Sequence, residues 1–119
     1  MSINQVALST DGSAPVLLPN EKVFFGRQGV RLELTYGNGC YTAAAGHIYL
    51  TNQRIIYLPT PSLVGFQSLA MPLLHINQGK LTQPWFNANY FSCLVEPVYH
   101  GGLPAPSQVK LYFNEGGKQ

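Results

Sequence analysis

Residues 46–59, GHIYLTNQRIIYLP, constrain the fold more than any other segment, because the polar residues 52–54 interrupt two apolar runs. The whole stretch is too short to cross a bilayer as a helix, which needs about 20 apolar residues. If Asn52 and Gln53 form the tip of a hairpin, each run becomes a strand whose apolar side chains face those of the other run. The expected cross-strand pairs on one face are Leu50 with Ile55 and Ile48 with Tyr57.

The rest of the chain repeats this arrangement of short apolar runs bounded by turn-forming residues, which is typical of strands. A charged fraction of 10 %, with 12 Gly and 9 Pro, also favours strands and turns over surface helices. The stretch 62–76 has the length of a helix, but Gly65 and Pro72 interrupt it, and a proline inside a helix costs about 3 kcal/mol. Seven strands are expected, over Glu21–Phe25, Val30–Tyr36, Gly46–Thr51, Ile55–Leu58, Phe66–Leu74, Tyr90–Val95 and Val109–Asn114.

The strand expected over residues 30–36 has the clearest alternation. Val30, Leu32 and Leu34 would share a buried face, and the side chains between them would face solvent. The Gly-Asn-Gly sequence at 37–39 follows this strand. Because Gly and Asn adopt positive φ at little cost, a tight turn is expected there.

The length of 119 residues predicts a single domain with one core. Residues 1–13 are mostly small and polar and are expected to form a flexible N-terminal arm, which leaves residues 14–119 as the folded domain. The N-terminal sequence has no basic flank or apolar segment of the kind that marks a secretory signal, and no run of 18 apolar residues occurs. We therefore expect a cytosolic or nuclear protein.

Charge and metal-ligand content exclude several classes of function. A net charge of +2 is far from the dense basic field of proteins that bind duplex nucleic acid, so no direct sequence-specific nucleic-acid binding is expected. The three histidines are far apart in the sequence and have no partner at zinc-ligand spacing, so neither a metal nor a cofactor is expected. Cys40 and Cys93 are expected to be two buried thiols and not a disulfide. No nucleophile elbow, phosphate loop or carboxylate pair accompanies them, which argues against an enzyme.

Two motifs of the chain resemble a known family. The hairpin segment carries Gly46, the Tyr-Leu-Thr run at 49–51 and Arg54, and it is similar to the centre of a GRAM domain, a variant of the pleckstrin-homology (PH) fold. Farther along, QPWFNANY at 83–90 and KLYFNEGG at 110–117 resemble the family of WW domain-binding protein 2. Two motifs in the same order argue against a chance match.

The resemblance covers residues 20–117 and implies a mainly β, PH-like (GRAM) seven-stranded antiparallel half-open barrel. It implies a non-enzymatic adaptor or transcriptional coactivator that associates with chromatin and acts by protein–protein recognition; some fungal relatives are stress-induced proteins. Animal members offer Pro-Pro-x-Tyr motifs to WW domains, so WW-domain or transcription-related proteins are the expected protein partners. A C-terminal helix normally closes one end of such a barrel, and it is largely absent here because only Lys118 and Gln119 follow the closing Gly-Gly.

The WW ligand motif has only a partial counterpart in Glu-Pro-Val-Tyr at 96–99, where Glu96 replaces the first proline. Pro97 and Tyr99 are therefore candidate partner-binding residues, although a strand end with Tyr99 packed against the sheet is the simpler interpretation. Trp85 is a third candidate, because Trp is enriched at protein-binding hot spots. Packing of this tryptophan over the end of the barrel would explain it equally well.

A peripheral membrane module that binds phosphoinositide headgroups is the alternative function. PH-like folds often hold such lipids with Lys and Arg from their first strands, and Lys22, Arg27 and Arg31 fall in that region. Two glutamates nearby dilute the positive field, so weak binding of anionic lipid competes with ordinary surface charge as the explanation. Arg54, beside the hairpin tip, is expected to satisfy turn carbonyls or to pair with a nearby acid, with ligand contact as the alternative.

Overall fold

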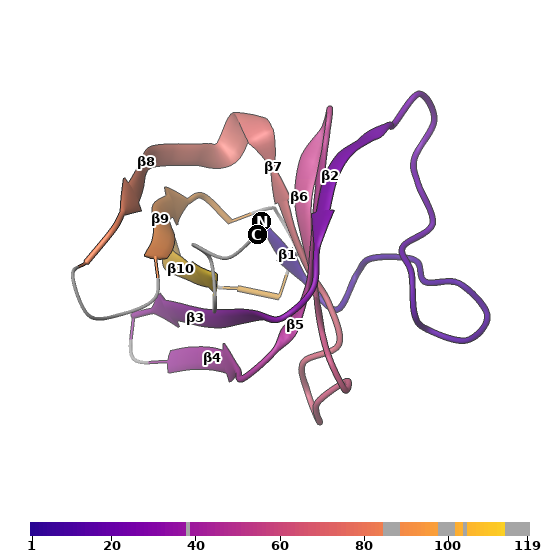
Figure 1. The fold of residues 1–119 in the computed structure, drawn as a ribbon, viewed down its shortest axis with the longest axis horizontal. Helices are drawn as coiled ribbons and strands as arrows, with labels where there is room; N and C mark the ends of the chain where they lie inside the picture. Colours follow the sequence, from indigo (N-terminus) through magenta and orange to yellow (C-terminus); the bar gives the residue numbers. More distant parts are fainter. Residues whose placement is uncertain (38, 85–88, 98–101, 104, 114–119) are drawn as a thin grey trace.

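The computed structural model describes residues 1–37, 39–84, 89–97, 102–103 and 105–113. They form two five-stranded antiparallel sheets and one short 3₁₀ helix, Leu73–His75 (Figure 1). The first sheet, in the order β1-β7-β6-β5-β2, contains β1 (Ser2–Ile3), β7 (Leu69–Pro72), β6 (Arg54–Pro59), β5 (Gly46–Thr51) and β2 (Val23–Arg27). The second sheet, in the order β4-β3-β10-β9-β8, contains β4 (Gly39–Ala43), β3 (Val30–Tyr36), β10 (Ser107–Phe113), β9 (Asn89–Val95) and β8 (Ile76–Thr82).

One long bent hairpin links the two sheets. Its first arm is β2 followed by β3, its second arm is β4 followed by β5, and both halves keep one register: Arg27 pairs with Ile48, and Leu32 pairs with Ala43. The first arm changes sheet at Gly29, whose φ of 75° is a conformation that residues with a side chain rarely adopt. Because the strands of the two sheets run at a steep angle to each other (Figure 1), this bend folds the sheets around a shared interior.

Alternating side chains of both sheets fill this interior. Val30, Leu32 and Leu34 of β3 are fully buried, while the residues between them are at least partly exposed, which confirms the expected alternation. Tyr57 of β6 is fully buried in the same cluster, and its hydroxyl donates a hydrogen bond of 2.7 Å to the carbonyl of Val30. Apolar packing and a buried hydrogen bond therefore hold the two sheets together.

The hairpin expected over residues 46–59 is confirmed. Leu50 pairs with Ile55, and Ile48 pairs with Tyr57, as the polar break predicts. Gly46 opens the hairpin because the ring and hydroxyl of Tyr57 lie against its backbone, where a Cβ atom would overlap them. The requirement for glycine at this position therefore comes from close approach.

All seven expected strands are present, although several bounds differ. β3 and β5 have the expected ends, whereas the strand expected over Phe66–Leu74 is shorter, because β7 stops at Pro72 and the chain turns into the 3₁₀ helix. β1, β4 and β8 are additional strands. β4, with the sequence GCYTA, and β8, with the sequence INQGKLT, lie at opposite edges of one sheet and lack the apolar alternation on which strand prediction depends.

The N-terminal residues depart from the expected flexible arm. Ser2 and Ile3 form β1, which pairs with β7, and the side chains of Met1, Ile3 and Val6 are buried. The side chain of Asn4 accepts a hydrogen bond of 2.6 Å from the backbone of Gln67, which ties the segment to the loop before β7. Three apolar residues at alternating or close positions are enough to add a short strand when a sheet edge is available, and the expectation of a loose arm is corrected for residues 1–6.

The described ranges contain no α-helix, so the C-terminal closing helix of the PH fold has no counterpart among them. Residues 114–119 lie outside the described residues. Within the same ranges, no helix has the length and apolar character required to span a membrane. The fold of the described chain is mainly β, as expected.

Candidate functional site

An apolar groove of about 350 Å³ opens between the two sheets, with walls from β2, β5 and β6 on one side and β8, β9 and β10 on the other. Phe25 of β2 and Leu81 of β8 belong to edge strands and are 48 % and 56 % exposed. Ile48 and Leu111 are buried and form the floor. Every lining residue is Phe, Ile or Leu, so the groove can bind apolar surface but has no side chain for chemistry.

The strands that line this groove carry charges of one sign. Among their described residues there are four Lys or Arg, namely Arg27, Arg54, Lys80 and Lys110, and no Asp or Glu. The guanidinium of Arg27 lies 5.3 Å from the ring centroid of Phe113, which is a lining residue. Arg27 therefore lies beside a lining side chain, whereas Lys110 lies over the ring of Tyr90, on the opposite face of its strand from Leu111, and Arg54 is paired with Glu21.

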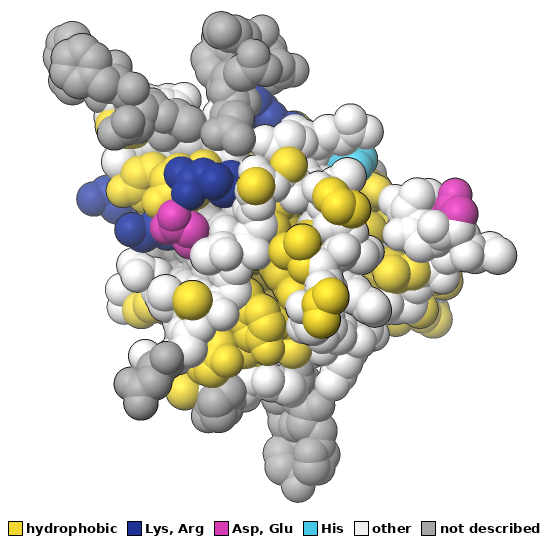
Figure 2. Space-filling model, turned by 90° about the horizontal axis from the view of Figure 1, so that it is seen from below, with side chains coloured by type: hydrophobic (Ala, Val, Ile, Leu, Met, Phe, Trp, Pro, Cys, Tyr) yellow, Lys and Arg dark blue, Asp and Glu magenta, His cyan; other side chains and the backbone are white. Residues whose placement is uncertain are grey.

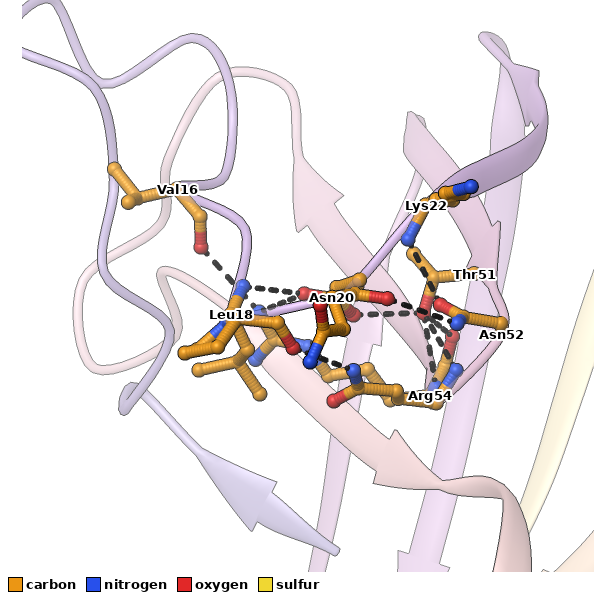
Figure 3. A network of polar contacts seen from close by, with 10 residues as sticks. Val16, Leu18, Asn20, Lys22, Thr51, Asn52 and Arg54 are labelled. Carbon is orange, nitrogen blue, oxygen red and sulfur yellow. Dashed lines mark hydrogen bonds and ion pairs between the residues drawn. The ribbon is translucent and has the colours of Figure 1, made fainter.

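A polar clamp, formed by Glu21, Thr51 and Arg54, holds the segment before β2 against the β5–β6 hairpin (Figure 3). Arg54 donates from Nε to Glu21 Oε2 at 2.8 Å and from Nη2 to Glu21 Oε1 at 3.0 Å. The Thr51 hydroxyl donates to Glu21 Oε2 at 2.7 Å, and the Leu18 amide donates to Oε1 at 2.8 Å. The prediction that Arg54 pairs with a nearby acid is confirmed.

The Glu21 carboxyl is fully buried, and burial alone would raise its pKa. Hydrogen bonds from Arg54, Leu18 and Thr51 and the positive charge of Arg54 outweigh burial and lower the pKa to about 2. The carboxylate is therefore ionised at neutral pH. Since β2 begins two residues after Glu21, the clamp fixes the start of the strand that carries Phe25 into the groove.

Comparisons with known proteins identify the family of the chain. No protein-family model matches it. A UPF0664 stress-induced protein of Schizosaccharomyces pombe is 37 % identical over 121 residues, which cover 98 % of this chain and 70 % of that protein. The chain belongs to the UPF0664 family. The expectation of a fungal stress-induced relative is thereby confirmed.

The UPF0664 chain also resembles a solved structure, the Vps36 N-terminal PH domain, with a TM-score of 0.62 and 23 % sequence identity over 95 % of this chain and 79 % of that chain. At this identity the likeness shows the fold alone. The two antiparallel sheets are therefore those of a PH-like domain, as expected from the sequence.

The three candidate lipid-binding cations of the UPF0664 chain do not form one compact site. Lys22 precedes β2, and its backbone is bound to Asn52 at the hairpin tip, whereas Arg27 is five residues away at the far end of β2. At the usual rise per residue this separates them by about 17 Å along the strand. Arg31 lies on the outer face of β3, where Glu33 binds it at 2.7 Å and its guanidinium covers the ring of Tyr112 at 3.8 Å. Their assignment to a lipid site stays a prediction.

Figure 2 shows Lys and Arg side chains gathered with an acidic side chain at the left of the face seen from below, where the second sheet lies. Hydrogen bonds connect these charges, since Glu33 accepts from both Arg31 and the hydroxyl of Tyr112. The positive field of this face is therefore partly neutralised.

The candidate partner-binding residues are only partly described. Trp85 and Tyr99 lie outside the described residues, and Pro97 is half-buried just after the end of β9. The groove was not predicted from the sequence. In the sequence, Phe25 is an ordinary residue of an expected strand. Leu81 belongs to β8, whose sequence lacks the apolar alternation that predicts a strand. The signal that could have found the groove is the absence of acidic residues from the strands around it.

Cysteine and histidine side chains have no catalytic arrangement in the described part of the chain. Both thiols are free, but Cys40, on the edge strand β4, is exposed and not buried as expected. Cys93 is buried, and burial raises its pKa to about 11, so its thiol stays protonated. His47 stacks on Tyr49 with ring centroids 4.1 Å apart, and burial lowers its pKa. No three His, Cys, Asp or Glu side chains of the described ranges come close enough to hold a metal ion.

Proposed function

We propose that this chain is a non-enzymatic recognition domain of the GRAM type, related to WW domain-binding protein 2, and that it works as an adaptor or coactivator by binding proteins. The observation that carries the proposal is the open groove with wholly apolar walls. A volume of about 350 Å³ lies within the range of about 300–1,000 Å³ that is usual for ligand sites. Apolar side chains left exposed along a groove are typical of protein-binding surfaces.

The PH-like fold supports a protein-binding or lipid-binding module in general, and two features favour protein. The groove walls present Phe, Ile and Leu to a partner, as the centre of a protein interface does. The cations assigned to lipid are dispersed, and Arg31 is already bound to Glu33. We infer that protein recognition is the primary activity.

The resemblance to WW domain-binding protein 2 supports WW-domain proteins or transcription-related proteins, including chromatin components, as partners. It also supports activity in both cytoplasm and nucleus. In this proposal the Glu-Pro-Val-Tyr segment is at most a weak WW ligand, because Glu96 occupies the place of the first proline.

Affinity capture from cell extract tests the proposal. The unsubstituted chain should recover WW-domain or transcription-related proteins, and Leu81→Glu, which places a charge in the groove, should lose them. Val64→Glu is the matched control, because Val64 is a fully exposed apolar residue outside the groove. Recovery of chaperones alone, or equal recovery by both variants, would contradict the proposal.

Binding of anionic lipid is the second candidate function. Arg27 and Arg31 contact the rings of Phe113 and Tyr112, whose side chains point to opposite faces of β10 because they are neighbours in a strand. In this case liposomes with phosphoinositides should bind the chain at low salt, and joint replacement of Lys22, Arg27 and Arg31 by Ala should abolish binding. Absence of binding at low salt would remove this candidate.

A further inference from the structure

We propose that the outer face of the second sheet binds single-stranded nucleic acid without sequence specificity. Bases stack on its aromatic and guanidinium groups, and phosphates bind to its lysines. This function goes beyond the protein recognition assigned to the groove, because β8, β9 and β10 line the groove with their opposite face. Three features carry the inference: the alternation of side chains along the strands, a stack of rings and a guanidinium, and the sign of the charges.

Side chains alternate between the two faces of the second sheet, so residues next to buried ones gather on its outer face. In β10, Leu111 is buried, and its neighbours Lys110 and Tyr112 point to the outer face. In β8, Leu81 lines the groove, and Lys80 points the opposite way. The register of the sheet places the outer side chains in two adjacent rows: Thr42, Glu33, Lys110, Ser92 and Lys80 in one, and Arg31, Tyr112, Tyr90 and Thr82 in the other.

A guanidinium and two rings form a stack on this face. The guanidinium carbon of Arg31 lies 3.8 Å from the ring centroid of Tyr112, and the rings of Tyr112 and Tyr90 have centroids 5.0 Å apart. Glu33 holds this arrangement, since it accepts hydrogen bonds of 2.7 Å from Arg31 and 3.1 Å from the Tyr112 hydroxyl. The Arg31 side chain is 39 % exposed, and both tyrosines are partly exposed. Unpaired bases stack on aromatic rings and on guanidinium planes, so the face is preorganised to receive them.

The charges of this face favour an anionic ligand. It carries three of the seven Lys and Arg residues of the chain and, in Glu33, one of the five Asp and Glu residues. Because Glu33 pairs with Arg31, the excess positive charge comes from Lys80 and Lys110, and neither lysine has an ion-pair partner among the described residues. Figure 2 shows hydrophobic side chains between Lys and Arg side chains on this face.

The position of Lys110 joins the two kinds of contact. Its ammonium lies 5.5 Å from the ring centroid of Tyr90, so a nucleotide whose base stacks on Tyr90 has its phosphate within reach of a positive charge. The hydroxyl of Ser92, which lies between Lys110 and Lys80 in its row, is a further donor to phosphate. Because bases and phosphates are common to both, single strands of DNA and of RNA fit this face alike.

A duplex does not fit the same face. Its bases are stacked on one another and unavailable to the tyrosines, and two lysines are far fewer than the 6–10 phosphate contacts typical of strong duplex binding. Stacking accepts any base, because every base has a π-face. The inference therefore agrees with the expectation, drawn from the net charge of +2, that sequence-specific binding is absent.

A set of labelled ligands tests the inference. The probe is a single strand of about 12 thymidine nucleotides, a length within the usual site sizes for single strands. The comparison ligands are a strand of the same length without bases, a duplex of the same length, an oligoglutamate and vesicles of phosphatidylserine. Fluorescence anisotropy with the full chain measures the affinity for each soluble ligand between about 0.05 M and 0.3 M salt, and sedimentation measures binding to vesicles.

We expect the thymidine strand to bind about tenfold more tightly than the strand without bases. Tyr90→Leu, which removes the ring, should reduce the affinity about tenfold, whereas Tyr90→Phe, which keeps it, should retain the affinity within about twofold. The slope of log affinity against log salt should be about −1.4 for contacts with two lysines, and about −0.7 after Lys80→Gln or Lys110→Gln.

Two variants outside this face are the matched controls. Lys22→Gln removes the same charge from an exposed position before β2, and Tyr49→Leu removes a partly exposed ring from the first sheet. Both should leave the affinity within about twofold. The melting temperature of each variant verifies that it is folded. Amide NMR spectra of the unsubstituted chain add a measurement that needs no variant, since the strand should shift the signals of Ser92 and Lys110 and leave that of Tyr49 in place.

Several outcomes would overturn the inference. No binding of the thymidine strand would remove it, and so would NMR shifts confined to the first sheet. Equal binding of the strand without bases or of oligoglutamate would show attraction by charge alone, without stacking. Equal or tighter binding of the duplex would contradict the preference for unpaired bases, and binding of vesicles with none of the strand would assign the face to a membrane. Equal loss of affinity in Tyr90→Leu and Tyr90→Phe would contradict the role of the ring.

Discussion

Glu21 and Arg54, which are 33 positions apart in the sequence, meet in a two-point ion pair in which the Glu21 side chain is fully buried and the Arg54 side chain is 11 % exposed. The geometry is that of charge-assisted hydrogen bonds, which are about twice as strong as neutral ones. The pair joins the segment that leads into β2 to the first residue of β6. Its burial distinguishes it from the exposed pair of Arg31 and Glu33.

Glu21→Gln should lower the free energy of unfolding by about 3 kcal/mol, because removing one partner of a buried pair leaves the other charge uncompensated. Glu33→Gln is the matched control. The Arg31–Glu33 pair has a similarly short contact, 2.7 Å against 2.8 Å, but its side chains are 39 % and 41 % exposed, so the loss should stay below about 1 kcal/mol. Urea unfolding of the three proteins measures both values, and equal losses would contradict the structural role of the clamp.

The stabilising effect of Glu21 should depend on pH. Its folded-state pKa is about 2 and the ordinary value is 4.5, so the stabilisation is complete above pH 4.5 and is lost as the pH falls towards 2. The difference in unfolding free energy between the unsubstituted chain and Glu21→Gln should therefore narrow between pH 5 and pH 3. Because both proteins retain all other carboxyl groups, the difference isolates Glu21. A constant difference over this range would show that the carboxylate does not gain its stability from ionisation.

Gly46→Ala should destabilise the chain by about 2 kcal/mol, since the new methyl group would overlap the ring and hydroxyl of Tyr57 and lie 2.7 Å from the carbonyl oxygen of Leu58. Gly26→Ala is the control within the same sheet. The tightest contact of a methyl group there would be the end of the His47 side chain at 3.3 Å, and its next neighbours lie at ordinary van der Waals distances of 3.8 Å and 3.9 Å, so the change should be less than about 1 kcal/mol. Thermal unfolding of the two variants compares them, and the opposite ranking would contradict the packing of Tyr57.

Ile3→Ala should cost about 2–4 kcal/mol, because Ile3 is buried in the main core and its removal leaves a cavity. In a flexible arm, the same substitution would have no effect. Val16→Ala, at a half-exposed position of the following loop, provides the control and should change stability by less than about 0.5 kcal/mol. Urea unfolding decides whether residues 1–6 belong to the folded domain.

Local features of this protein were readable in the sequence because the residues that interact are close together along the chain. The polar break at 52–54 predicts the pairs Leu50–Ile55 and Ile48–Tyr57, and the alternation over 30–36 predicts the buried face of β3. The mainly β class follows from the same two-residue alternation of apolar side chains along the expected strands. The positive charge of Arg54 made a pairing with an acidic residue predictable. Nothing in the sequence could identify Glu21 as that residue.

Strands without a pattern and contacts between distant residues were decided only by the tertiary structure. β4 and β8, whose residues are mostly polar or small, form strands because they pair with β3 and β9. β1, which contains Ile3, forms because it pairs with β7. The groove depends on bringing Phe25, Leu81 and Phe113 together from three separate strands. For the seven expected strands, the sequence alone determined that the segments extend and which of their faces are apolar, since these depend on neighbouring residues. The fold determined which apolar side chains of the described residues line the groove, because that depends on how the two sheets meet.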